Sequence, residues 1–356
     1  MNSESSSTPP LKTGSSLLIK LSLMFGVLIA TLGLVEIGLR VSGFTFHLYP
    51  QSLEFGYPDP KVLEGFFKRH DDFLWVSGRA QEKIAVAREE KPYLIFSGCS
   101  CTEWGGFDEA LAKRVSEEPG LAPLTYGNVA SSGWSSYQGL QQMRIQIAPL
   151  KPKVVTIFYG WNDHWMGFGV DDKTAGQLAG SSMLDRQELR LVQYLTKALA
   201  TRGVDSSKGA GENSRPDRVT LEDFGYNLRE MVKIARASGI KPVLITAPSS
   251  HIEGDEPDYL NQRFIKDISR LVPVHQAYVN AVREVAAEMD VVLCDLAKAF
   301  EALPREELLT YMREDGIHFT PEGGAKVGDV LFATMLENDL FLKAQAAGSK
   351  AQEDGK

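Results

Sequence analysis

The stretch SGCSCTEWGG places Ser100 between Cys99 and Cys101, directly after the apolar run YLIF. A serine hydroxyl acts as a nucleophile when a neighbouring base accepts its proton. Around a tight turn from a strand into a helix, the residues on either side of such a serine point away from where the serine points. Ser100 is therefore the favoured nucleophile and a thiol is the alternative. Both cysteines are expected to be small buried packing residues, as is Cys294 within a later apolar run.

A base for such a serine occurs near the C-terminus, in the sequence REDGIHFTPEGG. Histidine suits this role because an imidazole changes its charge near ambient pH. Asp315 precedes His318 by three residues, and from there it can hold the imidazole in the tautomer that leaves the other nitrogen facing Ser100. Thr320 and Pro321 have the residue types of a helix N-cap and a first helical position, which would fix the backbone of the histidine.

Polar residues also follow two apolar runs in the middle of the chain, in NVASSGWSSY and YGWNDHW. A serine, a glycine, an asparagine and a histidine thus arrive in chain order from four separate places, which is the pattern after which the SGNH hydrolases are named. The greater part of the chain resembles this superfamily, also called GDSL-type esterases. The resemblance implies that Ser100 is the nucleophile, that Asp315 and His318 complete a triad, and that Gly133 and Asn162 form an oxyanion hole with the Ser100 amide.

The chemistry of the two added residues agrees with this implied role. A glycine at position 133 lets the backbone approach a substrate closely, and the amide of Asn162 supplies an uncharged N–H. Such donors stabilise the negative oxygen of a tetrahedral intermediate. The sequence departs from the family at one position, because Gly98-Cys99-Ser100 stands where the signature has Gly-Asp-Ser, so the carboxylate before the serine is missing.

Most tryptophans lie within or beside these motifs. Flat aromatic faces in a cleft suit sugar rings, and large aromatic side chains equally form the walls of a site built from loops. Asp163 and His164, which follow Asn162 directly, are expected to be structural. The candidate substrate-lining residues are Trp104, Trp134, Trp161 and Trp165.

The elements that must position these residues alternate along the chain. Five apolar runs bounded by turn residues are predicted strands: YLIFSG, LTYGNVA, KVVTIFYG, PVLITAP and VVLCDL. The segments between them are apolar on one face at steps of three and four, as in helices. This alternation predicts a three-layer α/β/α sandwich with a central five-stranded parallel sheet, flavodoxin-like, in which ligands bind at the carboxyl ends of the strands.

The N-terminus has a different character, because residues 17–39 are almost wholly apolar apart from Lys20 and Glu36. About 20 helical residues cross a bilayer, Lys20 can reach the interface, and Glu36 can pair with Arg40 one turn later. This predicts one transmembrane helix, a signal anchor, with a cleaved signal peptide as the alternative. Basic residues occur in similar numbers on both sides of the span, so the positive-inside rule does not decide its orientation. The short Ser-rich tail before a single span favours a catalytic domain on the extracytoplasmic (periplasmic) side.

The chain is predicted to divide into a tail, an anchor, a stalk and one catalytic domain. The Gly/Ser-rich GAGENS part of a long insertion is expected to be mobile. The predicted segments are a cytoplasmic tail over 1–16, the anchor over 17–39, a stalk over 40–90, the hydrolase domain over 91–340 with its insertion at 164–219, and a polar tail over 341–356.

Composition excludes several classes of protein. A formal net charge of −8 and a pI near 5.4 argue against a partner such as nucleic acid, which requires a basic face. Three cysteines are an odd number, and two of them are separated by one residue, so no disulfide framework is implied. The ligand spacings CxxC and HxxxH of zinc sites do not occur, and we expect neither a metal nor another cofactor.

The leading functional hypothesis is a membrane-anchored serine hydrolase that cleaves a small-molecule or carbohydrate ester through an acyl-enzyme at Ser100. O-acetylated carbohydrate of the cell envelope is the favoured substrate class. One alternative is an O-acyltransferase, in which a hydroxyl of an exported polysaccharide takes the acyl group in place of water. The other is a non-catalytic glycan-binding protein that keeps the fold, with Cys99 as the first sign of lost turnover.

Overall fold

The computed structural model of the chain describes residues 14–44, 67–70, 72–167, 171–179, 189–200, 216–261 and 264–344. By their contacts, the residues fall into two compact units. One unit comprises Met1–His47 and Met183–Leu199, and the other comprises Leu48–Ser182 and Ala200–Lys356. The predicted GAGENS segment, the first 13 residues and the end of the polar tail lie outside the described residues.

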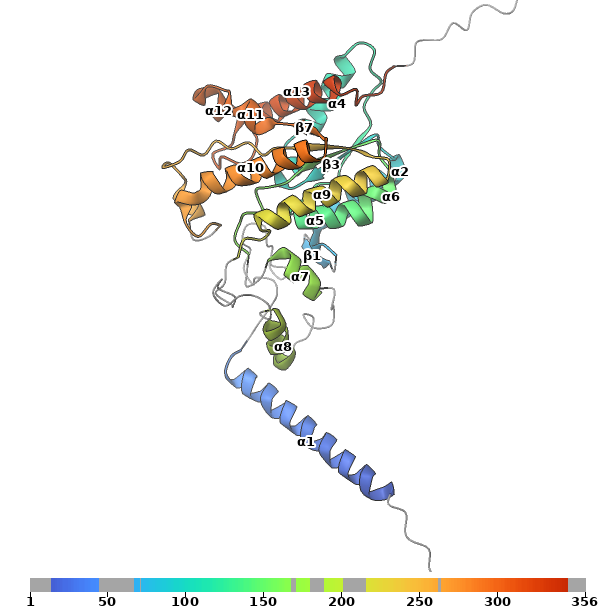
Figure 1. The fold of residues 1–356 in the computed structure, drawn as a ribbon, viewed down its shortest axis with the longest axis vertical. Coiled ribbons are helices and arrows are strands. Elements are labelled where there is room, and N and C mark those ends of the chain that lie inside the picture. Colours follow the sequence, from blue (N-terminus) through green and yellow to red (C-terminus); the bar gives the residue numbers. More distant parts are fainter. Residues whose placement is uncertain are drawn as a thin grey trace, which may run out of the picture. The chain divides into compact units, whose positions relative to one another are not determined.

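The second unit is built on a five-stranded parallel sheet (Figure 1). All five predicted strands are present, and their order is β4-β3-β5-β6-β7, which is the flavodoxin-like order. Chain order reverses between β3 and β5, and the carboxyl ends of both strands meet there because Gly98 is in register with Phe158. The strands are β3 (Leu94–Gly98), β4 (Tyr126–Asn128), β5 (Val154–Phe158), β6 (Lys241–Ile245) and β7 (Val292–Cys294).

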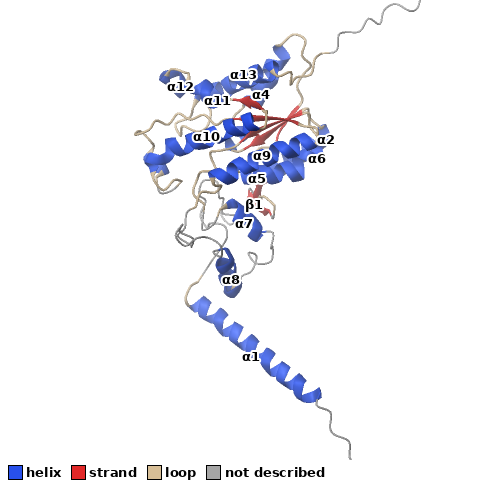
Figure 2. Ribbon diagram, in the orientation of Figure 1, coloured by secondary structure: helices blue, strands red, loops and turns tan. Residues whose placement is uncertain are grey.

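Helices cover both faces of this sheet, which confirms the predicted three-layer sandwich (Figure 2). Strands β3 and β5 are buried at every position, as a central strand between two helical layers requires. One layer contains α5 (Ser136–Gln142), α9 (Leu221–Ala237) and α10 (Leu271–Glu288), and the other contains α4 (Phe107–Glu117), α11 (Leu296–Glu301), α12 (Arg305–Tyr311) and α13 (Pro321–Glu337).

Shorter helices connect these layers to the strands. Helix α5 continues into a π-helical turn over Met143–Ile147, a local widening that the apolar periodicity does not predict. The other short helices are α3 (Ser100–Glu103), α6 (Ala148–Leu150), α7 (Asp172–Ala179) and the 3₁₀ turns Asp258–Leu260 and Ile268–Arg270.

The segment predicted to be a stalk contributes to the core of the second unit. It forms an antiparallel hairpin of β1 (Phe67–His70) and β2 (Leu74–Ser77), followed by α2 (Gly78–Glu90). All four residues of β2 are buried. Ser77 caps α2 by accepting a hydrogen bond from the Ala80 N–H. The compact unit therefore begins before residue 91, because an apolar run that was too short to indicate a strand by itself finds a packing surface in the folded domain.

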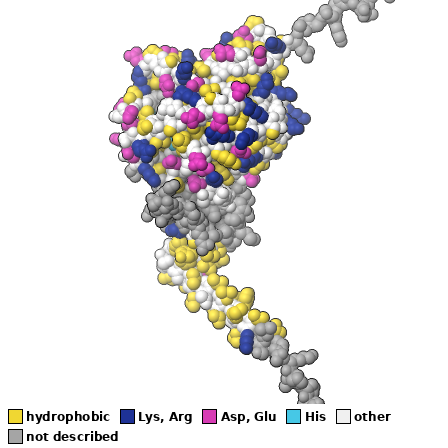
Figure 3. Space-filling model, viewed as in Figure 1, with side chains coloured by type: hydrophobic (Ala, Val, Ile, Leu, Met, Phe, Trp, Pro, Cys, Tyr) yellow, Lys and Arg dark blue, Asp and Glu magenta, His cyan; other side chains and the backbone are white. Residues whose placement is uncertain are grey.

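The first unit contains α1 (Gly14–Val41) and nearly all of α8 (Arg190–Ala200). Its segment Leu18–Val41 is long and apolar enough to cross a membrane, and its side chains are exposed (Figure 3), although a signal sequence has the same properties. The Glu36 carboxylate accepts hydrogen bonds from the backbone N–H groups of Arg190 at 3.0 Å and Leu191 at 2.7 Å. Glu36 also pairs with Arg40 at 2.6 Å. The end of α1 thus caps the first turn of α8.

Candidate active site

The turn that carries Ser100 is held by a close approach of backbone to side chain. Strand β3 ends at Gly98, and Ser100 is the first residue of α3. A Cβ atom on Gly98 would overlap Thr102 Oγ1 and lie 2.8 Å from the Phe158 carbonyl oxygen, so only glycine fits this position. Ser100 is 8% exposed, at the carboxyl end of the sheet where ligands bind in parallel α/β folds.

The structure brings Ser100, His318 and Asp315 into one chain of hydrogen bonds. His318 Nε2 lies 2.8 Å from Ser100 Oγ, and His318 Nδ1 lies 2.7 Å from Asp315 Oδ2. Thr320 caps α13 through the Gly323 N–H, with Pro321 as the first helical residue, so the histidine immediately precedes a fixed helix start. This arrangement can move a proton from the serine hydroxyl to the imidazole while the carboxylate holds the other ring nitrogen.

Asp315 is fixed by its own turn. Its Oδ1 accepts the backbone N–H groups of Ile317 and His318, both at 2.9 Å. Burial alone would raise the pKa of Asp315, but the hydrogen bonds from the His318 ring and from these two N–H groups outweigh burial and hold its pKa well below the ordinary value. His251 Nε2 lies 2.9 Å from the Asp315 carbonyl oxygen and supports the turn from outside. The carboxylate is therefore ionised at neutral pH.

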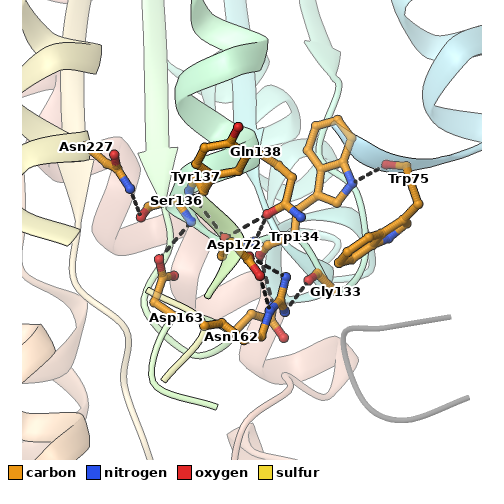
Figure 4. Close-up of polar contacts among 12 residues, drawn as sticks. Trp75, Gly133, Trp134, Ser136, Tyr137, Gln138, Asn162, Asp163, Asp172 and Asn227 are labelled. Atoms are coloured by element: carbon orange, nitrogen blue, oxygen red, sulfur yellow. Dashed lines mark hydrogen bonds and ion pairs between the residues drawn. The ribbon is translucent and has the colours of Figure 1, made fainter. Parts of the chain in front are cut away.

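Figure 4 shows part of the loop over residues 131–136, in which one backbone N–H group has no acceptor among the described residues. Within this loop, the N–H groups of residues 131, 132, 134, 135 and 136 donate to Gly98 O, Glu103 Oε2, Ser131 O, Gln138 Oε1 and Asp163 Oδ1, respectively. Among the described residues, the Gly133 N–H has no such acceptor, and Gly133 has a φ of +76°, which favours glycine. This N–H is therefore available to an oxygen of a substrate.

Asn162 lies beside this loop, where its side chain donates from Nδ2 to the Trp134 carbonyl oxygen at 3.1 Å. The reverse orientation of the amide would set two oxygens against each other, so this contact fixes which end of the amide is which. An amide nitrogen carries two N–H donors, and Nδ2 has no second acceptor among the residues that the structure describes, so one N–H can serve a ligand. Together with the first backbone N–H of α3, the N–H groups of Gly133 and Asn162 can serve a developing oxyanion.

Asp163 ties the strand that precedes Asn162 to this loop. Its Oδ1 accepts the Ser136 N–H at 2.8 Å and its Oδ2 accepts the Gly160 N–H at 3.1 Å. Burial raises the pKa of Asp163 to about 6 despite these hydrogen bonds. The next residue, His164, is also buried, with Nε2 3.1 Å from His275 Nδ1.

Both cysteines beside Ser100 are buried and unbridged. Cys101 Sγ lies 3.7 Å from the Ile317 carbonyl oxygen. A hydrogen bond with Cys99 and burial together raise the pKa of the Cys101 thiol well above its ordinary value. A raised pKa favours the neutral thiol, which is the less nucleophilic form.

The four candidate tryptophans have different environments. Trp104 is 47% exposed, and its Nε1 donates to Ser132 Oγ at 2.6 Å, directly before Gly133. The other three are at most 2% exposed: Trp134, Trp161 and Trp165. Trp134 Nε1 donates to the Trp75 carbonyl, and the Trp161 ring stacks on His275 at a centroid distance of 3.7 Å. Of the four, Trp104 therefore presents the most surface to a ligand.

A small apolar cavity of about 180 Å³ adjoins the Asp315 turn. Asp315 contributes to its wall, and the remaining lining residues are aromatic or aliphatic. These residues are Trp165, Tyr259, Leu260, Phe264 and Ile317. Among the residues that the structure describes, no group of three or more His, Cys, Asp or Glu side chains is arranged to hold a metal ion.

Three charged residues that contact the loop were not found from the sequence. Glu103 Oε2 accepts both the N–H and the hydroxyl of Ser132 at 2.6 Å, and Glu103 lies three residues after Ser100, a spacing that could have drawn attention to it. Arg218 donates to the Gly133 carbonyl at 2.7 Å and pairs with Asp172. No sequence motif identifies Arg218 or Asp172, because only the folded chain brings them to the loop.

Comparison with known proteins identifies the family of the chain. The family model for the GDSL-like lipase/acylhydrolase family matches residues 95–326, and the chain belongs to this family of SGNH hydrolases. It is accordingly an ester-hydrolysing enzyme. The comparison with curated proteins gave no match.

Solved structures with a related fold include a lipase/acylhydrolase from Enterococcus faecalis, with 18% identity, a TM-score of 0.46, and coverage of 71% of this chain and 98% of that one. A GDSL-like lipase from Bacteroides thetaiotaomicron has 18% identity, a TM-score of 0.42, and coverage of 73% and 94%. Axe2, an acetylxylan esterase from Geobacillus stearothermophilus, has 14% identity, a TM-score of 0.40, and coverage of 69% and 93%. The family assignment rests on the family model alone.

Proposed function

We propose that the chain is a serine esterase in which Ser100 is the nucleophile, His318 the general acid and base, and Asp315 the residue that orients and stabilises the imidazole. The observation that carries this proposal is the continuous chain of hydrogen bonds from Asp315 Oδ2 through both ring nitrogens of His318 to Ser100 Oγ. A non-catalytic protein would have no chemical need for this alignment beside the Gly133 N–H, which has no acceptor in the described part of the chain.

The reaction proceeds in two halves. Ser100 Oγ attacks the ester carbonyl while His318 Nε2 takes its proton, and the carbonyl oxygen becomes negative in the tetrahedral intermediate. The N–H groups of Ser100, Gly133 and Asn162 bind this oxygen. His318 then returns the proton to the leaving alcohol, which gives the acyl-enzyme. Water, activated by the same histidine, releases the acid and restores Ser100.

The substrate class that we propose is an ester of a short acyl group, such as an O-acetyl ester of cell-envelope carbohydrate. The cavity beside Asp315 is about 180 Å³ in volume, which is comparable to a cavity of ~150 Å³ that holds a benzene molecule. An acyl group lodged there is therefore limited to a few carbon atoms. Trp104, half exposed beside the loop of Gly133, offers an aromatic surface to a sugar ring.

We further propose that α1 is an uncleaved, single-pass membrane anchor with the catalytic unit on the extracytoplasmic side. The contacts of Glu36 support retention of the helix, because its carboxylate caps α8 through the N–H groups of Arg190 and Leu191. Cleavage after the span would leave the first turn of α8 without this partner. The intact mass of the purified protein distinguishes a chain that retains α1 from a chain cleaved after the span.

The esterase activity is tested by hydrolysis of p-nitrophenyl acetate with the full-length chain in detergent. We expect Ser100→Ala to reduce the rate to that of the buffer and Cys101→Ala to retain the parent rate, because the thiol beside the serine plays no chemical part. Parent-level hydrolysis by Ser100→Ala would contradict the proposal. Addition of an oligosaccharide acceptor, with mass analysis of the products, separates hydrolysis from acyl transfer.

A further inference from the structure

Arg218 and Asp172 form an ion pair whose two side chains are both 0% exposed. Arg218 donates from Nη2 to Asp172 Oδ2 at 2.9 Å and from Nε to Oδ1 at 3.3 Å. The loss of hydration makes a fully buried ion pair a weak contributor to stability unless its remaining polar groups are also bonded. The other contacts of this pair are therefore informative about what it does.

Both members of the pair contact the loop that carries Gly133, and Figure 4 shows Asp172 beside this loop. Arg218 Nη1 donates to the Gly133 carbonyl at 2.7 Å, and Ser135 Oγ donates to Asp172 Oδ2 at 2.6 Å. The guanidinium carbon also lies 5.3 Å from the centre of the Trp75 ring, in cation–π geometry. The ion pair thus holds the loop at the oxyanion-hole glycine and again two residues later.

Glu103 holds the same loop from the other side. Its carboxylate accepts the Ser132 N–H at 2.6 Å, immediately before the Gly133 N–H that has no acceptor among the described residues. The peptide groups next to this N–H are consequently fixed by a carboxylate on one side and by a guanidinium on the other. Gly133 has a φ of +76°, and a glycine without a Cβ atom can adopt many other backbone conformations. These contacts restrict it to one of them.

We propose that the buried Arg218–Asp172 pair is a positioning device for the oxyanion hole, which fixes the direction of the Gly133 N–H. This inference rests on the proposed esterase function of the site. Both residues lie in the segment between Asn162 and α9 that was predicted as an insertion, so this segment has a role in aligning the site. Arg218 and Asp172 act through Gly133 and do not themselves contact the substrate.

The variant Arg218→Lys tests the proposal because lysine keeps the charge but cannot reproduce the planar set of contacts to both Asp172 and Gly133. We expect kcat to fall by about 10- to 100-fold, since a small misplacement of a catalytic group has an effect of this size. KM should change by less than about threefold, because the lost interaction forms with the transition state rather than the bound ester. The rates are measured with p-nitrophenyl acetate on the full-length chain.

Arg283→Lys is the matched control. Arg283 pairs with Asp295 through two hydrogen bonds, Nε to Oδ2 at 2.9 Å and Nη2 to Oδ1 at 3.0 Å. Within the described ranges, no hydrogen bond or ion pair joins this pair to the loop 131–136. Each rate is divided by the number of sites that react with a fluorophosphonate, so that a partly unfolded sample is not counted. A purely structural role of Arg218 would reduce the number of reactive sites and leave kcat per site unchanged, which would overturn the proposal.

Hydrogen exchange of the segment 129–136 supplies a readout that does not depend on activity. We expect faster exchange in Arg218→Lys than in the parent and no change in Arg283→Lys. If Arg218→Lys does not fold, Asp172→Asn takes its place, with the same directions expected for exchange and kcat. A parent chain without hydrolysis would refute the esterase function, whereas unchanged exchange in a folded variant would refute the positioning role.

Discussion

The Asp315 carboxylate contacts His318 at two points, with Oδ2 2.7 Å from the ring Nδ1 and Oδ1 accepting the backbone N–H at 2.9 Å. One carboxylate therefore fixes both the position of the residue and the direction of its ring. Because hydrogen bonds hold the pKa of Asp315 well below its ordinary value, the oxygen facing Nδ1 is an acceptor at every pH at which the enzyme would work. This dictates a proton on Nδ1 and leaves Nε2 able to take the proton of Ser100.

Asp315→Asn should reverse this tautomer. The two backbone N–H groups at Oδ1 will retain the amide oxygen, so the NH₂ group will face His318 Nδ1 and present a donor to it. The imidazole must then carry its proton on Nε2, where it cannot accept the proton of Ser100. We expect kcat for p-nitrophenyl acetate to fall by about 10⁴-fold with the fold intact, as for the same change in other triads. A loss below about tenfold would contradict the assigned role.

Asn162→Ala should lower kcat by about 100- to 1000-fold with little change in KM, because one donor to the oxyanion is lost. The control is Thr246→Ala, which removes another buried polar side chain, whose Oγ1 donates to Asp295 Oδ1 at 2.9 Å rather than to a residue of the loop 131–136. We expect this control to lower stability and to retain kcat per reactive site. Equal losses of kcat in the two variants would show that Asn162 acts through packing alone.

Gly98→Ala should destabilise the catalytic unit, because the new Cβ would overlap Thr102 Oγ1 and crowd the Phe158 carbonyl. We expect the free energy of unfolding to fall by about 1–3 kcal/mol, as for other overpacked sites. Urea unfolding followed by tryptophan fluorescence measures this change. In the control Gly225→Ala, the Cβ meets only the end of the flexible Arg229 side chain, so stability should be retained or should rise. Equal stability of the two variants would contradict the account of the serine turn.

His275 should make the protein less stable in acid. Burial lowers the pKa of His275 from 6.5 to about 4, and its Nε2 lies 2.9 Å from the Ala247 carbonyl. Between pH 4 and pH 6.5, the unfolded state therefore binds more protons at this histidine than the folded state does. The stabilisation is therefore present above pH 6.5 and is lost as the pH falls toward 4, by about 3 kcal/mol in all at ~1.4 kcal/mol for each pKa unit.

The variant His275→Gln isolates this effect, because glutamine can still donate to Ala247 and accept from His164 but does not titrate. We expect the difference in unfolding free energy between parent and variant to be largest at neutral pH and to shrink toward pH 4. Urea unfolding at several pH values measures it. A difference that is independent of pH would show that His275 titrates alike in the folded and unfolded states.

The sequence predicts the strands and the candidate catalytic residues better than the residues that pack around them. Five apolar runs, which alternate with segments of helical periodicity, are sufficient to predict the five strands. The turn residues after β3 and β5 indicate where Ser100 and Asn162 lie. The apolar runs and the turn motifs can be recognised in the sequence because each involves residues that are close together along the chain. Strand β2 (Leu74–Ser77) is not predicted, because its four buried residues carry no polar alternation and are buried by contacts with residues distant in sequence, such as Trp134.

The charged residues around Gly133 illustrate the same limit. Arg218 and Asp172 are 46 positions apart and Arg218 is 85 positions from Gly133, so no spacing rule relates them. The buried environments of Trp134 and Trp161 likewise depend on partners such as Trp75 and His275. A tryptophan beside a motif in the sequence can face the interior, and burial is decided by the three-dimensional neighbours.

The central claim, that Ser100 is an activated nucleophile, is tested most directly by the intact mass of the full-length chain after treatment with a fluorophosphonate. We predict a single adduct on the parent and on Cys101→Ala, and none on Ser100→Ala. An adduct that persists on Ser100→Ala, or a folded parent that gains no mass, would contradict the claim.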